Sequence, residues 1–255
     1  MKKSNIIYAL LLITAVIGGV VLYEKQPSSD IPGYTIKPTP SIKSGTSSSP
    51  KPSATSSTSS PQANPATFSL KVPFTAQAPT GNWDQEHNDA CEEASALMAA
   101  AYLNGDTRAR IPATEVEKEL TRLFEWERAN FGYSLDTTVK ETAEMIRSVY
   151  NLKASVVNDY TEKNIKDALN ANKLVILPVN GRLIGNPYYK QPGPIYHMLV
   201  VRGYTATQLI TNDPGTKNGE NYKYYFSTLK NAPADWNHAT KTIDETKSLM
   251  IVVSK

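Results

Sequence analysis

The sequence predicts an α+β domain in which helices come first and a mainly antiparallel sheet follows. Between residues 90 and 150, apolar residues recur at the spacing typical of amphipathic helices. After Asn172 the pattern changes to short apolar or alternating runs, which are typical of strands. The later strands follow one another over links of hairpin length, and such links join antiparallel strands. A doubly wound parallel sheet is therefore not expected.

The first helix is expected over residues 90–103. Asp89 is its candidate N-cap, and Glu92 stands three residues later, which completes a capping-box pattern. Asn104 and Gly105 provide a C-terminal stop. Further helices are expected at 113–128, at 135–150 and, with Thr161 as N-cap, over a short segment that carries Ile165 and Leu169.

The first strand is expected at 68–72 and ends at Pro73, because proline cannot donate a hydrogen bond to a sheet. Residues 75–88 are expected to form a loop. The remaining strands are expected at 174–179, 198–201, 209–211, 222–226 and 249–253.

Residues 5–23 are almost entirely apolar and follow Lys2 and Lys3. A run of about 18 apolar residues is long enough to span the hydrocarbon core of a membrane. A secretory signal peptide is the competing interpretation, but its apolar region is shorter and ends at small residues. We expect an uncleaved signal anchor over 1–25, which leaves the C-terminal domain outside the cell membrane. Cleavage would give a secreted protein instead.

Residues 26–67 consist mainly of Ser, Thr, Pro and Lys, with almost no aliphatic side chains. Such a segment cannot bury enough apolar surface to offset the entropy lost on ordering, so we expect a disordered linker. One globular domain is expected over 68–255.

Composition excludes several classes of partner. The net charge of +3 is small and no basic stripe is interleaved with aromatic residues, so no nucleic acid is expected to bind. The three His residues and the single Cys have no metal-ligand spacing, so neither a metal nor another cofactor is expected. Exported domains use cysteines in disulfide pairs, and one unpaired cysteine in such a chain is a candidate reactive thiol.

That cysteine, Cys91, is expected in the first turn of a helix. The amide groups and dipole at a helix N-terminus favour an anion and lower the pKa of a thiol. Glu92 and Glu93 act in the opposite direction by their charge. Successive helical side chains point about 100° apart, so both carboxylates are expected to face away from the sulfur. The polar residues before Cys91 favour an exposed thiol over a buried one.

His197 and Asp213 are the candidate partners of the thiol. His197 starts a Val-rich strand and can accept the thiol proton and return it to the leaving group. Asp213 stands 16 residues later at a strand end, where its carboxylate can orient the imidazole. Asn212 is the competitor, but strand alternation places it on the opposite face. The alternative interpretations without a catalytic role are that His197 is a histidine of the hydrophobic core and that Asp213 is an ordinary turn residue.

An oxyanion formed in the reaction needs hydrogen-bond donors. The backbone N–H of Cys91 can supply one, and the side-chain amide of Gln77 or Gln85 another. His87 and His238 are expected to be solvated loop residues, and His87 is close enough to Cys91 in sequence to be of interest.

Five sequence blocks together resemble bacterial papain-like cysteine peptidases, and specifically the stand-alone relatives of the bacteriocin-processing peptidases, family thirty-nine. The resemblance extends from about Leu70 to Val253. The blocks, in order, are Val72 to Pro79, Asn82 to Asp84, Asp89 to Ser95, Tyr196 to Tyr204 and Asn212 to Thr216.

The resemblance implies a papain-like fold and a triad of Cys91, His197 and Asp213 with an oxyanion glutamine. The bacteriocin-processing members place that glutamine six residues before the cysteine, which selects Gln85, whereas the Gln-Ala-Pro block of the stand-alone relatives selects Gln77. We prefer Gln77. The processing members also carry Asp-Cys-Gly at the nucleophile and a fused transporter, neither of which is present here, so cleavage of double-glycine leaders is not expected.

The sequence therefore predicts an exported, membrane-tethered cysteine peptidase that acts on a peptide or protein substrate. The alternatives are an inactive surface binding module on the same fold, which the two adjacent Glu residues favour, and a thiol transferase or deamidase that uses the same triad.

Overall fold

The computed structural model describes residues 64–255. The expected signal anchor at 1–25 and nearly all of the linker at 26–67 lie outside these residues, so both stay predictions. Within residues 64–255, no helix combines the length and the apolar character needed to cross a bilayer.

The described residues form an α+β domain, as predicted. Its helices are α1 (Gln85–Asn88), α2 (Cys91–Leu103), α3 (Ala113–Asn130), α4 (Val139–Tyr150), α5 (Glu162–Asn170) and α6 (Phe226–Lys230). Its strands are β1 (Phe68–Ser69), β2 (Lys153–Asn158), β3 (Leu174–Val179), β4 (His197–Tyr204), β5 (Gln208–Asn212), β6 (Tyr222–Tyr225), β7 (Trp236–Asn237), β8 (Thr242–Ile243) and β9 (Leu249–Ser254).

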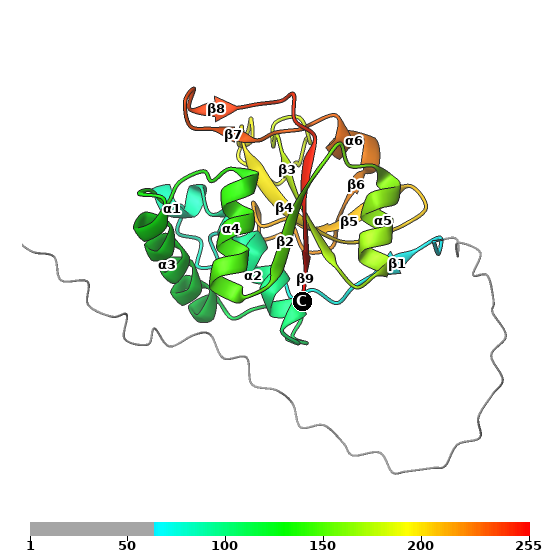
Figure 1. The fold of residues 1–255 in the computed structure, drawn as a ribbon, viewed down its shortest axis with the longest axis horizontal. Helices are drawn as coiled ribbons and strands as arrows, with labels where there is room; N and C mark the ends of the chain where they lie inside the picture. Colours follow the sequence, from blue (N-terminus) through cyan, green and yellow to red (C-terminus); the bar gives the residue numbers. More distant parts are fainter. Residues whose placement is uncertain (1–63) are drawn as a thin grey trace, which may run out of the picture. The chain divides into compact units, whose positions relative to one another are not determined.

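The main sheet has the strand order β2-β9-β3-β4-β5-β6, with β1 paired to β4, and β7 and β8 form a separate ribbon. Every strand pair of these two sheets is antiparallel. Strands β3 and β4 are buried along their whole length, which explains their nearly continuous apolar sequences. Helices α1 to α4 gather on one side of the sheet and α5 lies on the other (Figure 1).

Helix α2 is buried nearly all round, because it packs on β3 and β4 and also contacts α3 and α4. Its small residues, with five alanines in thirteen positions, allow this close approach on every side. One apolar cluster joins α2 to the sheet and α4, and a second joins α2 to α3 through Leu97, Leu120 and Phe124. The domain thus holds the N-terminus of α2 firmly against the sheet.

Local signals explain where the predictions were wrong. The expected capping box of Asp89 and Glu92 is absent, because Ala90 is the N-cap of α2 and no side chain caps it. Helix α4 begins four residues later than predicted, because Thr138 caps it and forms a capping box with Glu141. The first strand is only two residues long, and β2, α1, α6, β7 and β8 were missed.

Candidate active site

Cys91 is the first residue of α2 and is 3% exposed, so the expectation of an exposed thiol was wrong. Its Sγ accepts a hydrogen bond from the backbone N–H of Met198 over 3.2 Å. The same thiol donates to Oε2 of Glu92 over 2.8 Å. The expectation that Glu92 faces away from the sulfur was therefore also wrong: the carboxyl bends back along the helix terminus onto its neighbour.

The sequence predicted that the helix N-terminus lowers the pKa of the thiol, but the surroundings of Cys91 raise it. Burial raises the pKa of Cys91 well above its ordinary value, and the charge of Glu92 and the bond to its carboxylate raise it further. The N–H of Met198 lowers this pKa but is outweighed. The helix terminus alone does not activate this thiol, because burial and the adjacent carboxyl of Glu92 outweigh it.

His197 and Asp213 lie together, as the sequence suggested. Nε2 of His197 is 2.8 Å from Oδ1 of Asp213, and both side chains are buried. Because Asp213 engages Nε2, Nδ1 is the ring nitrogen that remains to exchange a proton with a thiol. His197 is also directly followed by Met198, whose N–H contacts the sulfur. The start of β4 thus carries both His197 and the backbone N–H that contacts the cysteine sulfur.

Three side chains that sequence reasoning missed also hold Asp213. The hydroxyls of Tyr189 and Tyr224 each donate to its Oδ2 over 2.6 Å, and the amide of Asn186 donates over 3.0 Å. Burial raises the pKa of Asp213, but the charge and hydrogen bond of His197 and the hydrogen bonds of the two tyrosines hold it below its ordinary value. Asp213 is therefore an ionised carboxylate whose second oxygen is fully occupied.

The turn after β5 fixes the backbone of Asp213. Its N–H donates to the carbonyl of Gly219, and its Oδ1 accepts from the N–H of Gly215. A Cβ on Gly219 would lie 1.8 Å from the carbonyl oxygen of Asp213, so only glycine allows this closure. Asn212 faces the other way and donates to the carbonyls of Val72 and Pro73, which is the alternation expected for neighbouring strand residues.

Gln77 lies in the same region, and its backbone N–H donates to the carbonyl of Pro214 over 2.9 Å. Its side-chain amide donates to the carbonyls of His87 and Asn88, and its Oε1 is buried without a hydrogen-bond partner. The amide hydrogens are thus already occupied in this state. Gln85, the competing candidate, is exposed on α1.

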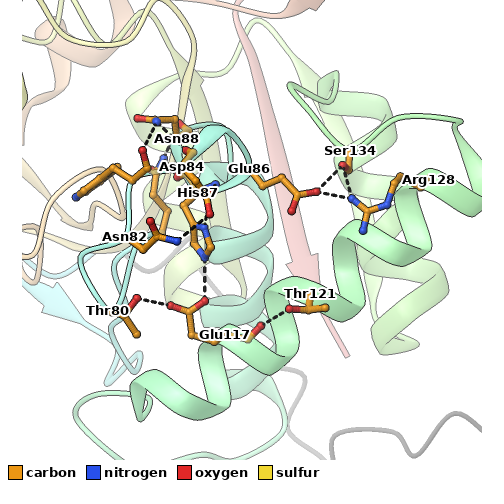
Figure 2. Close-up of polar contacts among 12 residues, drawn as sticks. Thr80, Asn82, Asp84, Glu86, His87, Asn88, Glu117, Thr121, Arg128 and Ser134 are labelled. Atoms are coloured by element: carbon orange, nitrogen blue, oxygen red, sulfur yellow. Dashed lines mark hydrogen bonds and ion pairs between the residues drawn. The ribbon is translucent and has the colours of Figure 1, made fainter.

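The ring of His87 lies between two carboxylates, so the expectation of a solvated loop residue was wrong (Figure 2). Nδ1 is 2.7 Å from Asp84 and Nε2 is 2.8 Å from Glu117 on α3. Burial lowers the pKa of His87, but the two carboxylates outweigh it and the net shift is upward. Thr80 donates to the same Glu117, so this network fastens the segment that carries Gln77 to α3. His238 lies on the surface and contacts Tyr133 and Glu141.

A cleft of about 1040 Å³ opens beside these residues, and both Gln77 and His197 line it. Trp83 and Tyr188 are large exposed aromatic residues in its wall. Lys190 and Lys217 line it, and its lining contains no Asp or Glu. The other lining residues are Ala78, Pro79, Thr80, Gly81, Asn88, Tyr189, Gln191, Pro192, Gly193, Pro194, Gly215, Thr216 and Asn218.

Comparison with known proteins supports the resemblance seen in the sequence. A family model described as "Peptidase_C39 like family" matches residues 69–243. The chain belongs to the peptidase C39-like family. No curated protein matches.

Among solved structures, the C39-like domain is similar to a protein from Bacillus anthracis that is described as a C39-like peptidase. The two share 15% sequence identity, with a TM-score of 0.47, and the match covers 74% of this chain and 98% of the other.

No group of three or more His, Cys, Asp or Glu side chains is arranged to hold a metal ion in the described part of this C39-like domain. Its residues provide a thiol, an imidazole and a buried carboxylate that is hydrogen-bonded to the imidazole. The roles of the three side chains that donate to Asp213 were not visible in the sequence, because Asn186 and Tyr189 lie in the loop between β3 and β4, Tyr224 lies on β6, and only the tertiary structure brings them to Asp213.

Proposed function

We propose that the chain is a cysteine peptidase in which Cys91 is the nucleophile, His197 the general base and acid, and Asp213 the group that orients the imidazole. The observation that carries this proposal is the buried pair of His197 and Asp213, whose Nε2 and Oδ1 atoms are 2.8 Å apart. His197 also directly precedes Met198, whose N–H contacts the sulfur of Cys91. Family membership supports the same reaction class.

The proposed reaction passes through a thioester. Nδ1 of His197 takes the thiol proton, and the sulfur attacks the carbonyl carbon of the peptide bond. As the C–N bond breaks, His197 donates the proton to the departing amine. Water, deprotonated by His197, then attacks the thioester, releases the carboxylic acid and restores the thiol.

Two local changes accompany substrate binding in this proposal. The thiol proton must turn from Glu92 to His197, because in the structure it is directed at Oε2 of Glu92. The backbone N–H of Cys91 and the amide of Gln77 would donate to the oxyanion. For Gln77 this requires one of its bonds to the carbonyls of His87 and Asn88 to be exchanged for the substrate oxygen.

We also propose that the peptidase domain acts outside the cell membrane. The support is in the sequence, where the apolar run at 5–23 follows two lysines and a Ser/Thr/Pro-rich linker connects it to the domain. The substrate is then a peptide or protein within reach of the cell surface.

The reaction class is tested by incubating the protein with a peptide library in water enriched in oxygen-18. A peptidase produces new C-termini that carry the heavy isotope, measured by mass spectrometry. A His197→Ala variant is the matched control and is expected to give none. Transfer of the acyl group to an added amine, or release of ammonia without chain cleavage, would assign a transferase or deamidase instead.

The binding module remains the second candidate, because the buried thiol donates to a carboxylate. It predicts a peptide ligand that binds the cleft, is recovered uncleaved and is retained equally by Cys91→Ala. Peptide cleavage that depends on Cys91 excludes it.

The charge of the cleft predicts a preference for acidic peptides. Lys190 and Lys217 line it without any acidic lining residue. Exposed charge pairs contribute about 0.2–1 kcal/mol each, so each lysine is expected to lower KM for an acidic peptide by about 1.4-fold to fivefold. The difference between matched Glu-containing and Lys-containing peptides should shrink as salt is added.

Lys217→Glu should abolish this preference, because Lys190 and the new carboxylate then oppose each other, whereas Lys173→Glu, at an exposed position outside the cleft lining, should not change it. Equal KM values for acidic and basic peptides at low salt would contradict the predicted preference of the cleft for acidic peptides.

A further inference from the structure

Glu92 is a fully buried carboxyl in contact with the sulfur of Cys91. Its side chain has no exposed surface, and Oε2 lies 2.8 Å from Sγ. Its other oxygen, Oε1, accepts from the backbone N–H of Thr137 over 3.0 Å. The carboxyl is thus held at both ends, and its orientation toward the sulfur is fixed by the backbone of the segment before α4.

The groups around Glu92 are predominantly acidic. Glu93 belongs to the same helix, Glu127 lies on α3, Asp136 precedes α4, and Tyr196 precedes β4, with its hydroxyl on the carbonyl of Thr137. Burial raises the pKa of Glu92 well above its ordinary value, and the charges of Glu93 and Asp136 raise it further.

The basic side chains in this region act on other carboxyls. His238 influences Asp136, and Arg128 influences Glu127. Among the ion pairs of the described residues, none involves Glu92. A negative charge at this position is therefore not neutralised by a basic side chain in contact with it.

A carboxyl and a thiol in contact do not share a proton equally. The ordinary pKa of a carboxyl is about four units below that of a thiol, and here burial raises the pKa of both groups. When the pair loses one proton, the negative charge therefore settles on the carboxylate and the sulfur remains a thiol. A thiolate then needs a second deprotonation, against a like charge 2.8 Å away.

We propose that Glu92 is a positioning residue that holds the proton on Cys91 and keeps the nucleophile latent in the free protein. The inference rests on the proposed function only in naming Cys91 as the nucleophile. Activation then requires the carboxyl to take up a proton or the thiol to turn away from it toward His197.

The substitution Glu92→Gln tests this directly. The amide oxygen is expected to accept the N–H of Thr137, as Oε1 does now, which leaves the amide NH₂ in the place of Oε2. The sulfur would then face a hydrogen-bond donor in place of a carboxylate, and a donor stabilises the thiolate. The side chain keeps its shape, so the substitution changes only its charge and the direction of its hydrogen bond with the sulfur.

The measurement is the rate of alkylation by iodoacetamide against pH, for the full-length protein. The chain has one cysteine, so every alkylation event reports on Cys91. The reagent is neutral, which removes any effect of protein charge on its approach.

In Glu92→Gln the midpoint of the profile is expected to fall by about one to three pH units. The rate at pH 7 should rise several-fold, which is less than the gain in thiolate because a less basic thiolate is a weaker nucleophile.

Glu93→Gln is the matched control. Glu93 is equally buried and next in sequence, but its carboxyl interacts with Glu127, and no hydrogen bond to the sulfur is recorded for it. The midpoint of its alkylation profile should shift by less than half of the shift expected for Glu92→Gln. Glu92→Met, which fills a similar volume without charge or donor, provides a second variant if the glutamine protein does not fold, and should shift in the same direction by a smaller amount.

Three results would overturn the inference: an unchanged midpoint in Glu92→Gln, slower alkylation, or an equal shift in Glu93→Gln, which would assign the effect to the general charge of the region. The alkylation assay needs no substrate. A shift in Glu92→Gln without peptide cleavage therefore refutes the peptidase alone, whereas Cys91-dependent cleavage with an unshifted profile refutes the role of Glu92 alone.

Discussion

Replacing Cys91 by alanine is expected to abolish peptide hydrolysis. Removing the nucleophile of a catalytic triad lowers kcat by about 10⁶, because only the oxyanion donors and substrate binding remain. The fold should survive, since the change removes one buried sulfur from a helix that is otherwise packed on all sides. We expect an unfolding free energy within about 2 kcal/mol of the wild type.

The measurement is kcat for a peptide found in the library screen, together with a thermal melt of the same preparation. The melt separates a lost nucleophile from a lost fold. Residual turnover above about one percent of wild type, from protein free of contaminating peptidase, would show that the sulfur is not the nucleophile.

The second large effect is expected for Asp213→Asn, for which kcat should fall by about 10⁴, as when a triad carboxylate becomes an amide. Oδ2 of Asp213 accepts hydrogen bonds from Tyr189, Tyr224 and Asn186. In the variant these three donors hold the amide oxygen in that place, which turns the NH₂ toward Nε2 of His197. Nε2 then has to accept a hydrogen bond, the ring proton moves to Nδ1, and Nδ1 can no longer take the thiol proton.

A matched variant distinguishes a change in the tautomer of His197 from a loss of packing around Asp213. Tyr189→Phe removes one of the three donors but keeps the carboxylate and the aromatic ring beside His197. It should lower kcat by less than about tenfold. If Asp213→Asn retains activity within tenfold of wild type while both proteins melt normally, Asp213 does not set the tautomer of His197.

Much of the framework could be predicted from the sequence, because its signals are local. Thr161 caps α5 as expected, and the apolar run at β3 has the predicted bounds. The juxtaposition of His197 and Asp213 also followed from a local rule, since two antiparallel strands joined by a short link place the start of the first strand beside the end of the second.

The surroundings of the thiol could not be predicted in the same way. The direction of Glu92 depends on the N–H of Thr137, which is 45 residues away in sequence. Helical spacing alone placed this carboxyl away from the sulfur, but the first turn of a helix leaves side chains free to bend back over the terminus. His87 likewise acquires its second carboxylate from Glu117, 30 residues on. Only the packed tertiary structure decides such contacts.

The candidate site joins distant parts of the chain. The bond from Met198 to the sulfur links residues 107 apart, and Asn212 reaches back 140 residues to Val72. Contacts of such separation close large loops and form slowly during folding. Helix α2 is complete long before β4 and β5 have been synthesised, so a nascent or truncated chain carries the thiol without its imidazole. An incompletely folded copy therefore lacks the pair of His197 and Asp213 that the proposed hydrolysis requires, and this pair is complete only once β4 and β5 have joined the sheet.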